Sequence, residues 1–189
     1  RLVPVARHLC ASTIPGQVSK AVVQRITVYP LAIPLRRKVT HAASERGVAD
    51  PVIVEVDLGG DIVGFGETVP RPYVTGETVD TVTSTILQGQ LAAFLSTFRP
   101  ESVPEALEAI DNLPWMEPEC GQIPAARAAV ELALLDAVLR FYRRSFEDVV
   151  TWMGLVGFGA PGSLRHVRYS GVLAAADMDR MRKQARLMY

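Results

Sequence analysis

Acidic residues are missing from the first part of the chain. The 189 residues contain 20 Lys and Arg and 20 Asp and Glu, yet no acid stands before Glu45. Because the formal net charge is zero, the chain lacks the overall positive charge that favours nucleic-acid binding. The cations of this acid-free stretch are Arg1, Arg7, Lys20, Arg25, Arg36, Arg37 and Lys38. The asymmetry indicates either a basic loop that faces an anion, or a tail followed by a solvated loop.

Cysteine is scarce, and long apolar runs are absent. Cys10 and Cys120 are the only two thiols, and their spacing argues against a disulfide framework or a zinc site. No segment approaches the roughly 18–20 apolar residues that a membrane-spanning helix needs. The basic first residues resemble a targeting peptide only faintly, since no long apolar stretch follows them. We therefore expect a cytoplasmic protein without a membrane partner.

The first half of the chain is rich in predicted strands. Hydrophobic residues make up 49% of the sequence, enough for the core of one domain. Residues 21–29 are β-rich, and residues 51–58 alternate apolar and polar side chains. Gly59 and Gly60 suit a tight turn into a third strand at residues 62–67. This pattern predicts a three-stranded antiparallel meander.

Two polar segments flank these strands, and each is expected to form a loop. Residues 30–50 are basic and polar, and a loop of that length inside a compact domain is often functional. Residues 68–76 contain two prolines and a glycine. Thr75 is expected to cap a helix that runs to about Phe98, with Glu77 in its first turn.

The second half of the chain predicts helices. Residues 104–113 form one, residues 146–153 a short one, and residues 124–144 the longest, with an intervening loop at residues 114–124. Apolar side chains of the longest helix form one stripe, namely Ala126, Val130, Ala133, Leu134, Ala137 and Phe141. Its acids Glu131 and Asp136 lie four residues from Arg127 and Arg140. We expect ion pairs there rather than catalytic groups.

The last segment does not fit an isolated α+β domain. A glycine-rich link at residues 154–163 precedes a predicted strand at 167–173 and a basic amphipathic helix at 174–188. One such β-α unit cannot satisfy its own edges, so it resembles the first unit of a larger fold. The link matches G-x-G-x-x-G, but a helix precedes it and a strand follows it, which excludes the dinucleotide fingerprint.

Several stretches in order resemble the enolase superfamily. They are ITVYPLAIPLRRKVTHA, VIVEVDLGGDIVGFGETVPRPYVTGET, AARAAVELALLDAVLR and HVRYSGVL. Within that superfamily they are most similar to the muconate-lactonizing (mandelate racemase/muconate cycloisomerase) subgroup of isomerases. The resemblance covers roughly residues 22–189.

The resemblance implies an α+β fold class in three parts. Residues 1–21 would be an N-terminal extension. Residues 22–160 would form the capping domain, a three-stranded antiparallel meander plus a helical bundle. Residues 161–189 would supply the first β-α unit of a truncated TIM-like barrel, since a whole barrel needs about 250 residues.

The resemblance also implies a chemistry. The parent enzyme would be a cycloisomerase, or a dipeptide or N-acylamino acid epimerase, that abstracts a proton α to a carboxylate. A Mg²⁺ ion would offset the developing charge. The barrel would carry the metal ligands and the catalytic lysines, so we expect neither catalytic nor metal-binding residues in this chain. The partners expected are a small carboxylate substrate and further copies of the protein in a homo-oligomer.

Two cap loops would then face the substrate. By position they are the Arg36–Asp50 and Val69–Thr75 loops, and their polar, basic and aromatic residues suit a carboxylate. The substrate-binding candidates are Arg37, His41, Ser44, Arg71, Tyr73 and Thr75. The rival hypothesis is a non-catalytic α+β binding module that recognises an anionic partner through the basic loop.

Overall fold

The structure is a computed structural model that describes residues 20–41, 44–118 and 121–154, the backbone of Val5–Arg7, and residues 179, 181–183 and 186. The chain divides into two units, Arg1–Met153 and Gly154–Tyr189. The predicted link at 154–163, except for Gly154, and the predicted strand at 167–173 lie outside the described residues. Within the predicted helix at 174–188, the five described residues are helical, and Arg182 lies 3.4 Å from the carboxylate of Asp179.

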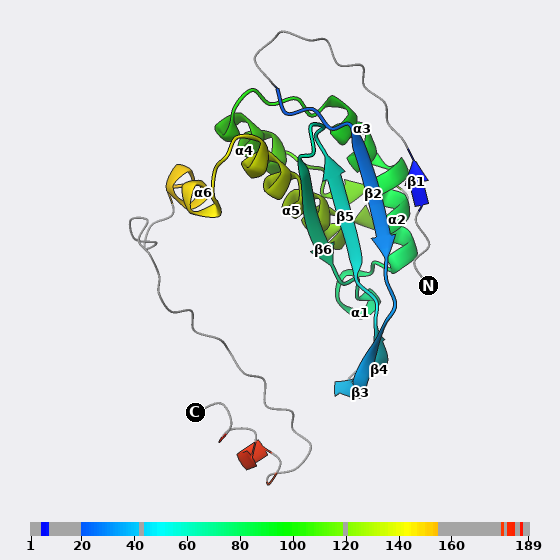
Figure 1. Ribbon diagram of the computed structural model, residues 1–189. Coiled ribbons are helices and arrows are strands. Elements are labelled where there is room, and N and C mark those ends of the chain that lie inside the picture. Colours follow the sequence, from blue (N-terminus) through cyan, green and yellow to red (C-terminus); the bar gives the residue numbers. More distant parts are fainter. Residues whose placement is uncertain are drawn as a thin grey trace. The chain divides into compact units, whose positions relative to one another are not determined.

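An antiparallel sheet forms the base of the first unit (Figure 1). Its order is β1-β2-β5-β6, and the strands are β1 (Val5–Arg7), β2 (Arg25–Pro30), β5 (Val52–Asp57) and β6 (Val63–Thr68). The predicted meander corresponds to β2, β5 and β6, although β2 begins at Arg25 rather than at residue 21. The alternation of β5 is confirmed, since Val52, Val54 and Val56 are fully buried. The edge strand β1 lies within residues 1–21, which were predicted to form an N-terminal extension.

Helices cover one face of this sheet, which confirms the predicted α+β class (Figure 1). They are α1 (Pro72–Thr75), α2 (Val79–Gln88), α3 (Gln90–Thr97), α4 (Val103–Asp111), α5 (Pro124–Phe141) and α6 (Phe146–Trp152). In α5 the predicted stripe is confirmed, because five of its six residues are fully buried and Phe141 packs against the core. None of the helices among the described residues has the length and apolar character that crossing a bilayer requires.

The closest packing in the unit joins β6 to α5. Gly64 and Gly66 both face the helix, because every second residue of a strand points to the same side. A Cβ at Gly64 would lie 2.6 Å from the Cα of Ala137, and a Cβ at Gly66 would lie 2.6 Å from the backbone nitrogen of Ala133. Glycine on the strand and alanine on the helix therefore let the two backbones meet.

The predicted helix that is capped by Thr75 and runs to about Phe98 is wrong in two respects. Thr75 does not cap it: Thr75 ends α1, and Gly76 follows with φ 78°. The cap of α2 is Thr78, whose hydroxyl accepts from Thr81 N while Thr78 N donates back to the Thr81 hydroxyl. The helix also breaks at Gly89, where Glu117 accepts a hydrogen bond from Gln90 N at the start of α3.

The predicted loop at residues 114–124 is also wrong in part. It holds two short paired strands, β7 (Met116–Glu117) and β8 (Gly121–Gln122).

The long loop predicted at residues 30–50 is instead a β-hairpin. Its strands are β3 (Ile33–His41) and β4 (Ser44–Ala49). The hairpin continues the ladder of β2 and β5: Pro30 lies opposite Val52, Leu31 N donates to Pro51 O at 2.9 Å, and Ile33 lies opposite Ala49. It extends beyond the end of the main sheet (Figure 1). No strand periodicity was detectable there, because none of the hairpin side chains that the structure describes is buried.

Candidate functional site

The two predicted cap segments meet at the end of the sheet. Val52 pairs with Thr68, so the residues just before β5 lie beside those just after β6. There one oxygen of Asp50, Oδ1, accepts from Arg71 Nη1 at 2.8 Å and from Arg46 Nη1 at 3.0 Å. Arg46 belongs to the hairpin and Arg71 begins the α1 turn. One carboxylate oxygen therefore connects both segments.

Tyr73 lies open to solvent beside this ion-pair cluster. Its side chain is 52% exposed. The guanidinium carbon of Arg46 lies 5.6 Å from the centroid of the ring, within the range of a cation–π contact. The site thus presents an exposed aromatic ring next to two arginines that are largely covered.

The α1 turn owes its shape to local hydrogen bonds. The carbonyl of Arg71 accepts from Val74 N at 2.8 Å and from Thr75 N at 2.9 Å. Pro72 suits the first position of this short helix, because proline fixes φ and needs no donor there. Gly76 ends it with a left-handed φ of 78°, a conformation that glycine adopts without cost. The turn is therefore compact before any ligand binds.

Glu77 fastens this turn to the longest helix. Its side chain is only 4% exposed, and its two oxygens accept from Ala125 N at 2.7 Å and Ala126 N at 2.9 Å. These amides begin α5, whose own cap residue Ile123 supplies no side-chain hydrogen bond. A carboxylate at a helix N-terminus is also favoured by the helix dipole. The turn is therefore anchored on the domain core.

The structure describes the side chains of three of the six predicted site residues and only the backbone of the other three. Arg71, Tyr73 and Thr75 share the α1 turn, with Arg71 engaged by Asp50 and Tyr73 exposed. Arg37 belongs to β3, and His41 pairs with Ser44 where β3 and β4 meet. The side chains of Arg37, His41 and Ser44 lie outside the described part of the chain.

Sequence reasoning missed the residues that join the two segments, namely Arg46 and Asp50. A signal for them existed in the predicted β5–β6 hairpin. Its antiparallel register carries the residues before β5 to the residues after β6, which predicts that Asp50 lies near Arg71. The buried role of Glu77 had no such signal, because its partners lie 48 and 49 residues further along the chain.

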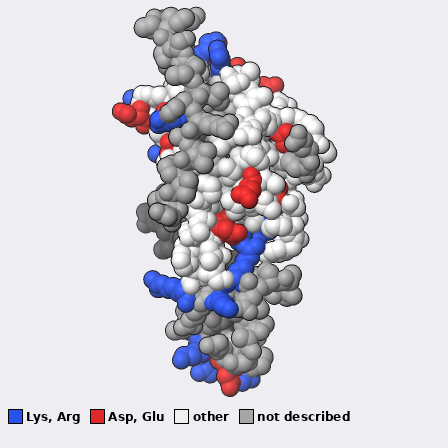
Figure 2. Space-filling model, turned by 90° about the vertical axis from the view of Figure 1, so that its right-hand side faces the viewer, with Lys and Arg blue, Asp and Glu red and all other residues white. Residues whose placement is uncertain are grey.

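Basic side chains surround this site. Figure 2 shows Lys and Arg gathered over the β3–β4 end of the first unit. Arg36 and Lys38 are exposed, while Arg46 and Arg71 are only partly so. Among the side chains that the structure describes here, the carboxylate of Asp50 binds both Arg46 and Arg71.

The described residues of this site do not form a metal centre. Among the residues that the structure describes, no three His, Cys, Asp or Glu side chains gather closely enough to hold a metal ion.

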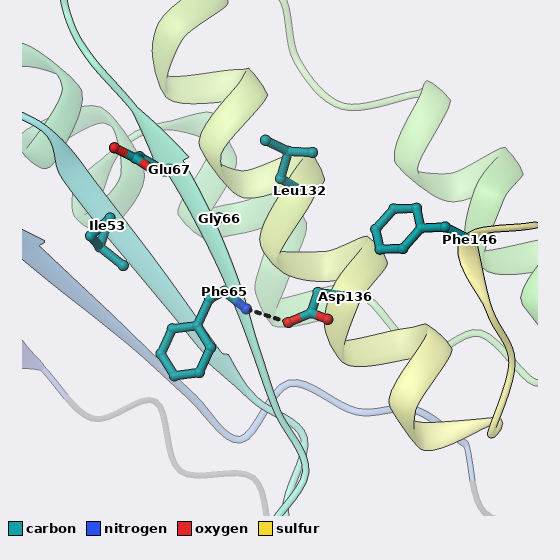
Figure 3. A pocket seen from close by; sticks show the side chains of 7 residues that line it. All are labelled: Ile53, Phe65, Gly66, Glu67, Leu132, Asp136 and Phe146. Carbon is teal, nitrogen blue, oxygen red and sulfur yellow. Dashed lines mark hydrogen bonds between the residues drawn. The ribbon is translucent and has the colours of Figure 1, made fainter. Parts of the chain in front are cut away.

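A second, apolar hollow lies where the edge of β6 meets α5 and α6, with a volume of about 330 Å³ (Figure 3). Its lining residues are Ile53, Phe65, Gly66, Glu67, Leu132, Asp136 and Phe146. Asp136 has both oxygens engaged, one by Phe65 N at 3.0 Å and the other by Arg140 Nε at 2.9 Å. The predicted Asp136–Arg140 ion pair is confirmed, and the same carboxylate connects α5 to the edge of β6.

Known proteins resemble the described body of the chain. A hydrophobic dipeptide epimerase of Enterococcus faecalis is 31% identical over 115 residues, which are 60% of this chain and 30% of the relative. An aromatic dipeptide epimerase of Herpetosiphon aurantiacus is 32% identical over 120 residues, 64% of this chain and 32% of the relative. The chain therefore spans about a third of the length of these relatives. No family model matches it.

A solved structure agrees with these relatives. It is a mandelate racemase/muconate lactonizing protein from Herpetosiphon aurantiacus, 30% identical, with a TM-score of 0.51 over 65% of this chain and 32% of that one. By these similarities the chain resembles the N-terminal capping domain of mandelate racemase/muconate lactonizing enzymes of the enolase superfamily. The first unit carries the hairpin and the α1 turn at one end of its sheet (Figure 1).

Proposed function

We propose that this chain is the substrate-facing, capping part of an enolase-superfamily isomerase that acts on a small carboxylate. Within that class we propose a dipeptide or N-acylamino acid epimerase, or a cycloisomerase. The observation that carries the proposal is the meeting of the hairpin and the α1 turn around Asp50, on a body similar to dipeptide epimerases.

The site chemistry supports a carboxylate ligand. Arginine binds carboxylates through a planar fork of donors, and the exposed ring of Tyr73 offers an apolar wall beside it. We propose that Arg71, Tyr73 and Thr75 from the turn face the substrate, with Arg37, His41 and Ser44 from the hairpin. These residues would bind and orient the substrate and exclude water.

The chemical step would belong to groups other than these. Removal of a proton α to a carboxylate needs a base and a way to offset the charge that develops on the oxygens. A bound Mg²⁺ would supply that electrophilic stabilisation. The capping residues contribute affinity and selectivity, and we propose a homo-oligomer as the working form.

The proposal can be tested by kinetics on the protein that contains this chain. Arg71→Gln should raise KM for dipeptide substrates by about tenfold or more, because a charge-assisted hydrogen bond is worth roughly 1.5–3 kcal/mol. Tyr73→Ala should alter the ranking of side chains that the enzyme accepts. Both variants should change kcat less than KM, since neither residue handles the proton.

Arg140→Gln is the matched control. Arg140 is also an arginine in an ion pair, with Asp136 at 2.9 Å, but it lies on α5 rather than on the capping segments. It should leave KM and substrate ranking as they are. Unchanged KM and ranking in both Arg71→Gln and Tyr73→Ala would refute the assignment.

The basic surface also supports a second candidate, a non-catalytic module that binds an anionic partner. The exposed cations of the hairpin, Arg36 and Lys38, favour it. The two candidates differ in salt dependence: a surface patch should lose most of its affinity for a polyanion such as heparin between low and moderate salt. A protein that epimerises dipeptides and ignores heparin would leave only the first candidate.

A further inference from the structure

Asp50 stands between two segments that are distant in the sequence. Its Oδ1 atom binds Arg46 of the hairpin at 3.0 Å and Arg71, the residue that precedes α1, at 2.8 Å. Arg46 in turn lies over the ring of Tyr73. We propose that Asp50 is a positioning residue that couples the hairpin to the α1 turn, so that both segments keep one arrangement.

The hairpin needs such a coupling because its own ladder is irregular. Regular pairing stops after Pro34 and resumes at Val39 in a shifted register. The described side chains of the hairpin pack against no core, and Ile33 and Val48 are about half exposed. The α1 turn, in contrast, is anchored on α5 through Glu77. Asp50 would therefore hold the weakly packed hairpin against the anchored α1 turn.

The negative charge of Asp50 lies between two positively charged guanidinium groups. Two guanidinium nitrogens lie within 3.0 Å of one carboxylate oxygen. The side chains of Arg46 and Arg71 are only 20% and 24% exposed, so water screens their charges incompletely. Without the carboxylate, two like charges would face each other and push the hairpin away from the turn.

The inference depends on the proposed function only in calling these segments substrate-facing. Its test therefore uses the protein that contains this chain, without any ligand. Amide hydrogen exchange, followed by mass spectrometry, should compare the wild type with Asp50→Asn, Asp50→Glu and Asp61→Asn. Asp61 is exposed in the β5–β6 turn with φ 64°, a conformation that Asn tolerates, so it is the matched control.

Asp50→Asn should speed exchange by about three- to tenfold in peptides that cover residues 44–50 and 71–76, as expected for the loss of a partly covered ion-pair cluster. Exchange in α5 should stay as in the wild type. Asp50→Glu should restore much of the protection because it restores the charge, and Asp61→Asn should have no effect on either segment.

A spectroscopic probe at Tyr73 separates a positioning role of Asp50 from a general effect on stability. In chain labelled with 3-fluorotyrosine, the Tyr73 resonance is assigned by its loss in Tyr73→Phe. Asp50→Asn should shift or broaden that resonance, because Arg46 would no longer be held over the ring.

Three outcomes would overturn the inference. Asp50→Asn could leave both segments and the Tyr73 resonance unchanged, or it could affect one segment alone. It could also speed exchange in α5 as much as in the hairpin, which would make Asp50 a general stabilising residue. None of these outcomes involves substrate, so they are separate from failure of the kinetic test.

Discussion

The β6–α5 interface and the β3–β4 hairpin both contain β-strands, yet different interactions fix their positions. At the interface, Gly64 and Gly66 let the strand lie directly on a helix of buried alanines. In the hairpin, the described side chains are not buried, and an ion-pair cluster at Asp50 connects it to its neighbour. In the first unit, steric fit fixes the β6–α5 scaffold, while charged side chains connect the hairpin to the α1 turn.

The largest expected loss of stability comes from adding one methyl group at the β6–α5 interface. A Cβ at Gly66 would overlap the backbone of α5, which cannot move away as a side chain would. We expect Gly66→Ala to lower the free energy of unfolding by about 3–5 kcal/mol, or to prevent folding. Urea titration followed by circular dichroism measures it.

Gly47→Ala is the matched substitution in the hairpin. The nearest atom to a Cβ there is Lys38 Cγ at 3.9 Å, an ordinary contact. We expect a change within about 0.5 kcal/mol. Equal losses in the two alanine variants would show that the interface is not as tight as its geometry indicates.

Loss of the Glu77 contact between the α1 turn and α5 should rank second. Glu77→Gln keeps the size of the side chain but replaces a carboxylate oxygen that accepts from the first amides of α5. We expect the free energy of unfolding to fall by about 1.5–3 kcal/mol, since a buried helix cap is lost. The control is Glu108→Gln on the exposed side of α4, which should melt with the wild type.

The edge of the sheet should tolerate change better. Asp136 accepts from Phe65 N on strand β6 and pairs with Arg140 in the next turn of α5. We expect Asp136→Asn to cost about 1 kcal/mol, because an amide can keep one hydrogen bond but loses a partly exposed ion pair. A double substitution with Arg140→Gln should add little further loss, which thermal melts can check.

The smallest effect should come from pH. Burial raises the pKa of Tyr29, and its hydrogen bond to Glu55 at 2.9 Å raises that pKa further. Stability from the neutral phenol is therefore present below the unfolded pKa of about 10 and is lost as pH rises through the folded pKa. Between about pH 9.5 and 11, the wild type should lose stability more steeply than Tyr29→Phe, by tenths of a kcal/mol. Parallel curves would contradict this.

The elements with a buried face were predictable from the sequence. Val52, Val54 and Val56 alternate because one side of β5 lies on the core, and the stripe of α5 follows the helical period for the same reason. The hairpin at residues 33–49 was predicted as a loop, since no burial imposes a period on it. The break at Gly89 and the cap at Thr78 depend on contacts with Glu117 and Thr81 that propensity alone does not reveal.

The candidate site was predictable in part. Loop position and residue type indicated Arg71 and Tyr73, and the structure brings them together beside Arg46 and Asp50. Arg46 and Asp50 stand four residues apart, a spacing usually associated with helices, but here Arg46 lies in strand β4 and Asp50 directly follows that strand. Their connection to Arg71 follows from strand register, which a motif does not contain.

The most direct measurement transfers the two capping segments to a relative with a known activity. In the hydrophobic dipeptide epimerase of Enterococcus faecalis, the segments that correspond to residues 33–49 and 70–76 are replaced by those of this chain. The values of kcat/KM are then compared over a panel of dipeptides. We predict a folded chimera that still epimerises dipeptides but ranks them in a new order. A folded, active chimera with the same ranking as the parent would contradict a substrate-facing role for these segments.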